Sequence, residues 1–200
     1  MTSRAHLLLL ASAALLLTSS CSIIPEASSD PTRFFVLEDL AASTALDAPA
    51  NDGVTLGLLP IEVTAYLVDS RAIAVTTSAN EVTFRNFDRW AEPLDEGIAR
   101  VLRTALSRQV SVKQVLVPPF PLTPARDYDL SIRLSECTGL QSGSIRYSLA
   151  FALTRPDGTL FKQGSFLRDD TPWSGESDDL ARLLSQATAS AAQSIAAELP

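Results

Sequence analysis

The residues of this chain that could carry reactive chemistry are few, and most of them lie near its beginning. Its thiol and imidazole groups come from two cysteines, Cys21 and Cys137, and one histidine, His6. A basic start leads into an apolar block of eleven residues, 7–17. This order is typical of a secretory signal peptide, and the block is shorter than the roughly 20 residues that span a bilayer. We therefore expect residues 1–20 to be removed as a signal peptide.

Removal of this segment limits the chemistry open to the mature chain. Loss of His6 leaves no imidazole, and loss of Arg4 changes the formal net charge from −7 to −8. Ser-His-Asp and Cys-His catalysis need a histidine base, and common zinc sites use histidine as a ligand. An acidic chain without basic runs also argues against binding of nucleic acid and against polybasic docking on anionic lipid. We predict no catalytic residue, no cofactor and no metal site, although a hydrolase that uses two carboxylates stays open.

Cys21 directly follows the apolar block and predicts a lipid attachment. Residues 18–21, TSSC, resemble a bacterial lipobox, whose cysteine receives diacylglycerol and becomes the mature N-terminus. The other interpretation is an ordinary signal peptide cut nearby, with Cys21 free or joined to Cys137. We favour acylation, because a lone cysteine directly after such a block is otherwise hard to explain. Ser22, in place of an aspartate, favours sorting to the outer membrane over retention at the inner membrane.

Cys137 is expected to be a small buried side chain and not a nucleophile. With Cys21 acylated, no second cysteine remains for a disulfide, and no histidine remains to activate the thiol. Acidic residues gather around Trp173, but their spacing does not match a calcium loop and suits the beginning of a helix better. These residues are Asp169, Asp170, Glu176, Asp178 and Asp179.

Hydrophobic periodicity predicts one folded domain, 33–200, behind a short tether. Residues 21–32 would form the lipidated N-terminus and this tether, which reaches at most about 35–40 Å and would hold the domain close to its membrane. Several segments have the alternating or continuous apolar pattern of strands, and two longer ones carry a helical apolar stripe. The expected strands are 33–40, 54–63, 112–119 and 128–137, the expected hairpins are 72–84 and 145–167, and the expected helices are 93–110 and 177–199.

Three side chains are candidates for docking a partner protein: Arg89, Trp90 and Trp173. Tryptophan and arginine are favoured anchors at protein interfaces. We prefer to interpret Trp90 as a core residue beside a helix start, with Arg89 in a local ion pair to Asp88 or Glu92. Trp173 lies in a polar, proline-bent loop, so it is the better candidate for an exposed contact.

Two longer stretches resemble a known family. The segments LGLLPIEVTAYLVDSRAIAV (56–75) and FDRWAEPLDEGIARVLRTAL (87–106) are similar to the ABC-type transport auxiliary lipoproteins, the PqiC (YmbA-like) family. The run RWAEPL (89–94) is the most specific element, and the resemblance covers 33–199. The chain departs from the family pattern at Asp69-Ser70-Arg71 and at Glu136-Cys137.

This resemblance implies a fold and a function. The implied fold is a single three-layer α/β domain with a mixed β-sheet and two main helices. The implied function is that of a non-enzymatic outer-membrane lipoprotein on the periplasmic face, which works beside a mammalian-cell-entry (MCE) protein of a lipid transport system. Whether the domain also forms a homo-oligomer is left open. The competing hypotheses are a stand-alone envelope lipoprotein that binds a ligand or regulates an envelope enzyme, and a small lipid hydrolase.

Overall fold

The computed structural model describes residues 29–39, 53–68, 71–123 and 125–200. The chain divides into two units, Met1–Pro31 and Thr32–Pro200, and the folded domain is the second. The predicted signal peptide, Cys21 and most of the tether therefore lie outside the described residues. Among the residues that are described, no helix is both long and apolar enough to cross a bilayer.

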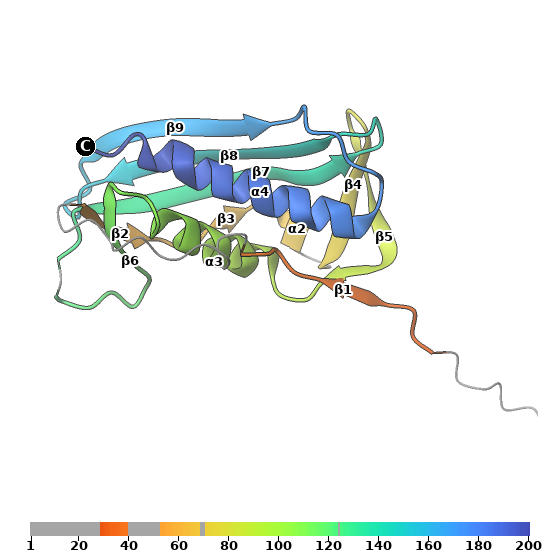
Figure 1. Ribbon diagram of the computed structural model, residues 1–200, viewed down its shortest axis with the longest axis horizontal. Coiled ribbons are helices and arrows are strands. Elements are labelled where there is room, and N and C mark those ends of the chain that lie inside the picture. The colour runs from red at the N-terminus through yellow and green to blue at the C-terminus, as the bar shows by residue number, and fades with distance from the viewer. Residues whose placement is uncertain (1–28, 40–52, 69–70, 124) are drawn as a thin grey trace, which may run out of the picture. The chain divides into compact units, whose positions relative to one another are not determined.

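The domain is built from nine strands and three helices within the described residues (Figure 1). In chain order these are β1 (Arg33–Phe35), β2 (Val54–Leu58), β3 (Glu62–Val63), α2 (Ala65–Val68), β4 (Ala72–Ser78), β5 (Glu81–Trp90), α3 (Leu94–Leu106), β6 (Val112–Leu116), β7 (Tyr128–Leu140), β8 (Ile145–Thr154), β9 (Leu160–Arg168) and α4 (Ser177–Ala196).

One mixed sheet holds all nine strands, and the long strand β7 organises it. On one side β7 pairs antiparallel with β8, which pairs antiparallel with β9. On its other side β7 pairs in parallel with three short strands in turn, β2, β3 and β4. Strand β6 joins β2 in parallel, β5 joins β4 antiparallel, and β1 joins β5 in parallel at the edge. The predicted α/β class and mixed sheet are confirmed.

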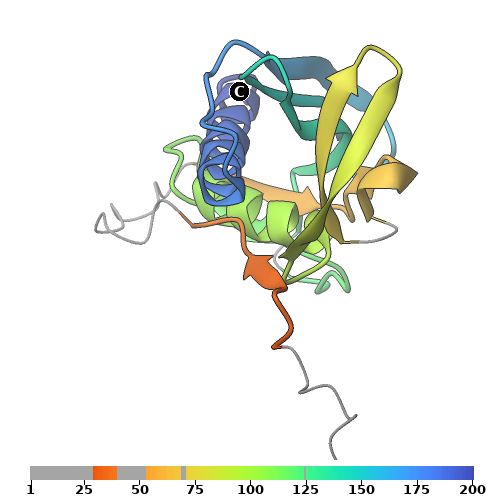
Figure 2. The same cartoon turned by 90° about the vertical axis from the view of Figure 1, so that its right-hand side faces the viewer.

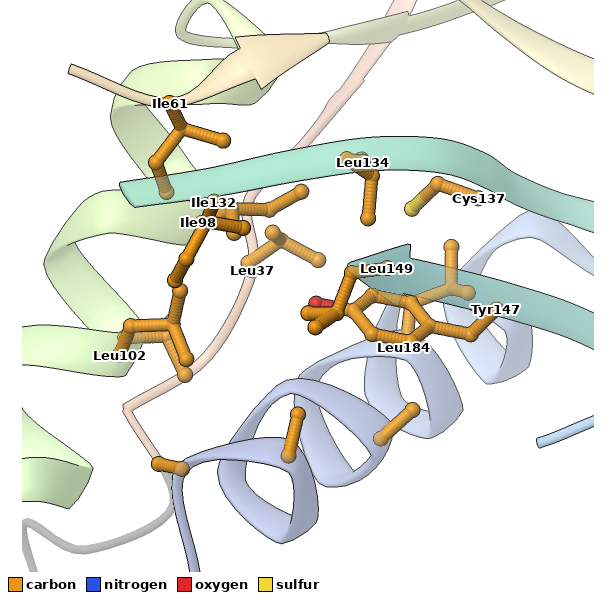
Figure 3. Packing of buried hydrophobic residues seen from close by; sticks show 14 of the residues in the cluster. Leu37, Ile61, Ile98, Leu102, Ile132, Leu134, Cys137, Tyr147, Leu149 and Leu184 are labelled. Carbon is orange, nitrogen blue, oxygen red and sulfur yellow. The ribbon is translucent and has the colours of Figure 1, made fainter. Parts of the chain in front are cut away.

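The core lies between this sheet and the two long helices. Strand β8 alternates strictly, so that Tyr147 and Leu149 point inward from it, and the fully buried Leu184 of α4 faces them (Figure 3). Helices α3 and α4 also pack against each other, on the same side of a curved sheet (Figure 2). Outward positions of β8 are at least partly exposed, so along this strand the described domain has two layers and not the three that the resemblance implied.

The two main helices are confirmed, with shorter ends than predicted. The expected apolar stripe of α3 is buried from Leu94 to Ala105, and Asp95 and Glu96 occupy its first turn. The helix ends at Leu106, where the hydroxyl of Ser107 donates a hydrogen bond to the carbonyl oxygen of Arg103, 2.8 Å away. Helix α4 ends at Ala196.

The predicted strands form, but their ends differ from prediction: 33–40 stops at Phe35, 112–119 stops at Leu116, and 128–137 continues to Leu140. Both hairpins form, as β4–β5 and β8–β9, but β5 continues to Trp90, six residues beyond the predicted end. The predicted strand 54–63 is divided in two around Pro60, which lacks the N–H that a ladder requires. Helix α2 was not predicted.

Candidate functional site

Three segments that are distant in sequence meet at one end of the sheet. The β4–β5 hairpin is joined to the end of β7 by the register pairs Val75–Gly139 and Thr76–Leu140. The turn from β7 to β8 is then fastened to the loop before α4, because the N–H of Trp173 donates to the carbonyl oxygen of Gly143 at 3.0 Å. Strand pairing thus brings the Trp173 loop beside the middle of the β4–β5 hairpin.

Trp173 seals this junction. Its indole N–H donates a hydrogen bond to the carbonyl oxygen of Leu140 at 2.9 Å, and only 8% of the residue is exposed. The ring lies against the backbone of Gly139, where a Cβ atom would stand 2.5 Å from the ring carbon Cζ2. The exposed contact predicted for Trp173 is therefore corrected. The polar loop buries the ring because a glycine on β7 leaves room for it.

An arginine and a phenylalanine complete the site beside Trp173. The guanidinium of Arg85 lies 5.9 Å from the Trp173 ring centroid, and it donates a hydrogen bond of 2.6 Å to the carbonyl oxygen of Gly175. Phe84, next along β5, is 42% exposed. These three side chains line an open hollow of about 410 Å³. We call it the Trp173 hollow, and its residues are Val75, Thr77, Thr83, Phe84, Arg85, Leu140, Gln141, Gly143, Trp173, Ser174 and Gly175.

The chemistry of the Trp173 hollow is that of a binding surface. It offers aromatic surface and one guanidinium, a combination that suits an apolar side chain next to a carboxylate. A larger hollow of about 550 Å³ lies over β7 and β8, but its charged residues Glu62 and Arg133 are exposed and pair with each other at 2.9 Å. The Trp173 hollow is therefore the better candidate site.

Asp88 forms a buried polar junction further along β5. Arg33 of β1 donates two hydrogen bonds of 2.9 Å to the Asp88 carboxylate, and the hydroxyl of Ser177 donates a third of 2.5 Å. Burial alone would raise the pKa of the Asp88 carboxyl, but these bonds and the nearby charges of Arg33 and Arg85 outweigh it. The pKa therefore lies below its ordinary value of 3.8. The junction ties the first strand and the first residue of α4 to β5.

We expect the domain to lose stability in acid when the Asp88 carboxylate is protonated. A carboxyl whose pKa is lowered by folding stabilises the folded state above its unfolded pKa, and this contribution is lost as the pH falls through the lower, folded pKa. The loss attributable to Asp88 should therefore occur below pH 3.8. Asp88→Asn should lower the free energy of unfolding at neutral pH by about 1–2 kcal/mol, because Arg33 is partly solvated. It should also flatten the acid limb of a stability–pH curve measured by denaturant unfolding.

A matched control for this experiment is Glu136→Gln. Glu136 lies 3.7 Å from Arg146, and both side chains are more than a third exposed, so this substitution should leave the curve nearly unchanged. If Asp88→Asn leaves the acid limb of the stability–pH curve unchanged, the loss of stability in acid comes from other carboxyl groups.

The structure separates the other two predicted docking residues from the Trp173 hollow. Trp90 is 4% exposed and faces the core in register with Phe35 of β1, so its predicted burial is confirmed. Arg89 donates to the carbonyl oxygens of Arg85 and Asp88, at 2.7 and 3.2 Å. The predicted local ion pair of Arg89 with Asp88 or Glu92 is wrong, because Asp88 pairs with Arg33 and Glu92 pairs with Arg100.

Glu92 accepts a hydrogen bond of 2.5 Å from Arg100 on α3. Sequence reasoning also missed Arg85, Phe84 and Gly139. The alternation of β5 marks Phe84 as a strand residue, but only the pairing of β4 with β7 brings it to Trp173.

Of the other residues considered for chemistry, the described ones Cys137 and Asp179 take part in packing and in local hydrogen bonds. Burial raises the pKa of the Cys137 thiol, and the residue is 2% exposed, which confirms its predicted place in the core. Of the acidic residues near Trp173, Asp179 accepts a hydrogen bond of 2.8 Å from the backbone N–H of Ser174 and pairs with Arg182. Within the described ranges no three metal-ligating side chains gather in one place.

Comparison with protein families places this fold. The family model for the ABC-type transport auxiliary lipoprotein component matches residues 35–196. No curated protein matches the chain.

Three solved structures are similar to it. A crystal structure of an uncharacterized protein is 21% identical, with a TM-score of 0.67, over 84% of this chain and 97% of that one. A protein from Xanthomonas campestris is 15% identical, with a TM-score of 0.64, over 82% and 93%. The PelC dodecamer from Paraburkholderia phytofirmans is 16% identical, with a TM-score of 0.44, over 76% and 94%. The first two show the same fold.

Proposed function

Because the chain belongs to the ABC-type transport auxiliary lipoprotein family, we propose that it is a non-enzymatic outer-membrane lipoprotein that docks the MCE tunnel protein of an intermembrane lipid transport system. The observation that carries the proposal is the family match over 35–196, which spans nearly the whole folded domain. In this proposal the lipid passes through the partner, and the present domain supplies an anchor and a docking surface.

The anchor is Cys21, with residues 22–32 as the tether. One acyl chain gives only marginal membrane binding, whereas two or more hold a protein stably at about 0.8 kcal/mol per buried CH₂ group. Stable attachment is what an accessory subunit needs if it is to hold a larger partner at a bilayer.

The loss of this anchor is a direct prediction. Cys21→Ser should move nearly all of the protein from the membrane fraction to the soluble periplasmic fraction, without changing the unfolding temperature of the domain. Cell fractionation measures where each protein is found, and intact mass spectrometry shows whether position 21 carries acyl chains. Cys137→Ser, at the buried thiol, is the matched control and should stay in the membrane fraction. A wild-type protein with an unmodified thiol at position 21 would remove the anchor from the proposal.

Docking is proposed at the Trp173 hollow. Phe84 is its exposed aromatic group, Arg85 is half-buried beside it, and Trp173 forms its packed wall. Trp90 takes part only by supporting β5 from the core, and Arg89 lies on the neighbouring surface of the same strand. The partner group that fits is an apolar side chain beside a carboxylate, since Arg85 donates at this position.

Site-specific crosslinking in the native envelope tests this assignment. A photoreactive side chain at position 84 should capture the MCE protein, whereas the same group at Leu122, which is 98% exposed, should not. Phe84→Ser should weaken recovery of the partner about tenfold, which corresponds to about 1.4 kcal/mol. Capture of no MCE protein from position 84, together with tight binding of a small ligand by the purified protein, would overturn the docking role in favour of the ligand-binding hypothesis.

A further inference from the structure

Large apolar side chains are exposed beside the first strand. Phe34 is 67% exposed, Val36 is 54% exposed and Phe87 is 53% exposed. Folded domains do expose single apolar residues, but a contiguous group of them marks a contact surface.

Strand register places these side chains on one face. Phe34 of β1 is the register partner of Arg89 on β5, and side chains at paired positions lie next to each other on the same side of a sheet. Phe87 precedes Arg89 by two residues, so it points the same way, while Asp88 between them is buried. Directly after β1, which ends at Phe35, Val36 is exposed and Leu37 lies in the core. Phe34, Val36, Phe87 and Arg89 therefore form one surface, which we call the β1 surface.

The β1 surface carries one positive group, the guanidinium of Arg89, while the exposed Glu38 follows Val36 by two residues at its margin. Arg89 donates hydrogen bonds to the carbonyl oxygens of Arg85 and Asp88, and these uncharged acceptors do not neutralise the guanidinium. The β1 surface thus combines a guanidinium with two phenylalanine side chains on the same face, a combination found where proteins meet phosphate head groups at the edge of a bilayer.

The covalent distance to the predicted anchor decides which partner covers this surface. β1 begins at Arg33, and the eleven residues 22–32 allow at most about 35–40 Å between the membrane and this strand. Among the strands that the structure describes, β1 is the one nearest in sequence to Cys21. A bilayer is therefore always within reach of the β1 surface, at a high effective concentration.

The size of the surface also favours lipid over another protein. A buried aromatic side chain covers roughly 150–250 Å², so three half-exposed apolar residues offer on the order of 300 Å². A stable protein interface needs about 800 Å² on each side. At three residues, β1 is also a short template for strand addition by a second chain.

We propose that the β1 surface rests on the membrane, with Phe34, Val36 and Phe87 at the boundary between head groups and acyl chains and Arg89 at the lipid phosphates. This rests on the proposed function, because it needs the Cys21 anchor. The contact fixes which side of the domain faces the bilayer, so that the chain is an oriented platform and not a domain that swings freely on its tether.

The test uses the full mature lipoprotein in vesicles of phosphatidylethanolamine and phosphatidylglycerol. Single cysteines are introduced as Phe34→Cys and Phe87→Cys, and in the control as Leu122→Cys, and each is labelled with a fluorophore that responds to polarity. The buried Cys137 is protected from labelling. Leu122 follows β6, at the other end of the path of paired strands from β1, and it is 98% exposed. Brominated lipids then report contact with acyl chains.

We expect blue-shifted emission and about twofold quenching by brominated lipids at positions 34 and 87, with neither effect at position 122. Unquenched labels on a protein that still sediments with vesicles would overturn this inference and leave the anchor standing. Blue-shifted emission without quenching would show that a second protein copy covers the surface, and it would also overturn the inference. Failure to sediment would remove the anchor, and the proposed function and this inference would then fall together.

Discussion

Replacing Trp90 by alanine should lower the free energy of unfolding by about 3–5 kcal/mol, because a large ring is removed from a site that is 4% exposed. Trp90 is the last residue of β5, lies in register with Phe35, and stands four residues before Leu94, where α3 begins. Its loss leaves a cavity where an edge strand, a long strand and a helix start meet. For a domain of this size the unfolding temperature should fall by about 2–4 °C for each kcal/mol. Denaturant and thermal unfolding of the mature protein measure both quantities.

The neighbouring residue supplies the matched control for Trp90→Ala. Arg89→Ala removes hydrogen bonds to two carbonyl groups at a partly exposed position, so it should cost less than about 1 kcal/mol. An unchanged unfolding temperature for Trp90→Ala, together with loss of partner capture, would show that this tryptophan acts as an anchor and not as a core residue.

Local patterns were sufficient to predict the elements that bury one regular face. Strand β8 alternates without interruption, and it begins at Ile145, where the predicted hairpin 145–167 begins. The stripe on α3 is equally clear, and only the last turn was overestimated, because residues 107–110 carry helix-compatible side chains in a turn. Periodicity reports burial, so it succeeds wherever burial is one-sided.

Elements that depend on distant pairing were harder to predict. Strand β5 reaches Trp90 because β1 pairs with its last three residues, and nothing in 85–90 alternates in hydrophobicity. Strands β2 and β3 are short because β7 meets them one after the other along its length. Such pairings arise between segments more than fifty residues apart, beyond the reach of any local pattern.

The candidate site divides in the same way. Cys21 is predicted from adjacent residues alone, since the proposed modification is read from a short segment. The burial of Trp173 instead depends on Gly139, thirty-four residues earlier, and composition of the loop pointed the other way. Arg85 gave no sequence signal, because an arginine on a strand is usually solvated and its role here comes from the ring beside it.

The contact between Trp173 and Gly139 can be tested by a double-mutant cycle. Trp173→Ala should cost about 3–5 kcal/mol, since it empties a site that is 8% exposed and leaves the Leu140 carbonyl without its indole donor. Gly139→Ala alone should cost about 1–3 kcal/mol, because its Cβ would stand 2.5 Å from a ring that is held by that hydrogen bond.

Combined, the two substitutions should cost less than their sum by about 2 kcal/mol, because alanine at 139 meets no ring once Trp173 is gone, and a strand prefers alanine to glycine. Denaturant unfolding of the four proteins measures this coupling free energy. Strictly additive costs would show that the ring does not rest on the glycine. If the two substitutions are coupled, Gly139 on β7 sets the position of the Trp173 ring, which forms a wall of the Trp173 hollow. Gly139→Ala should then also weaken partner capture at position 84, although neither residue 139 nor the Trp173 ring is freely exposed.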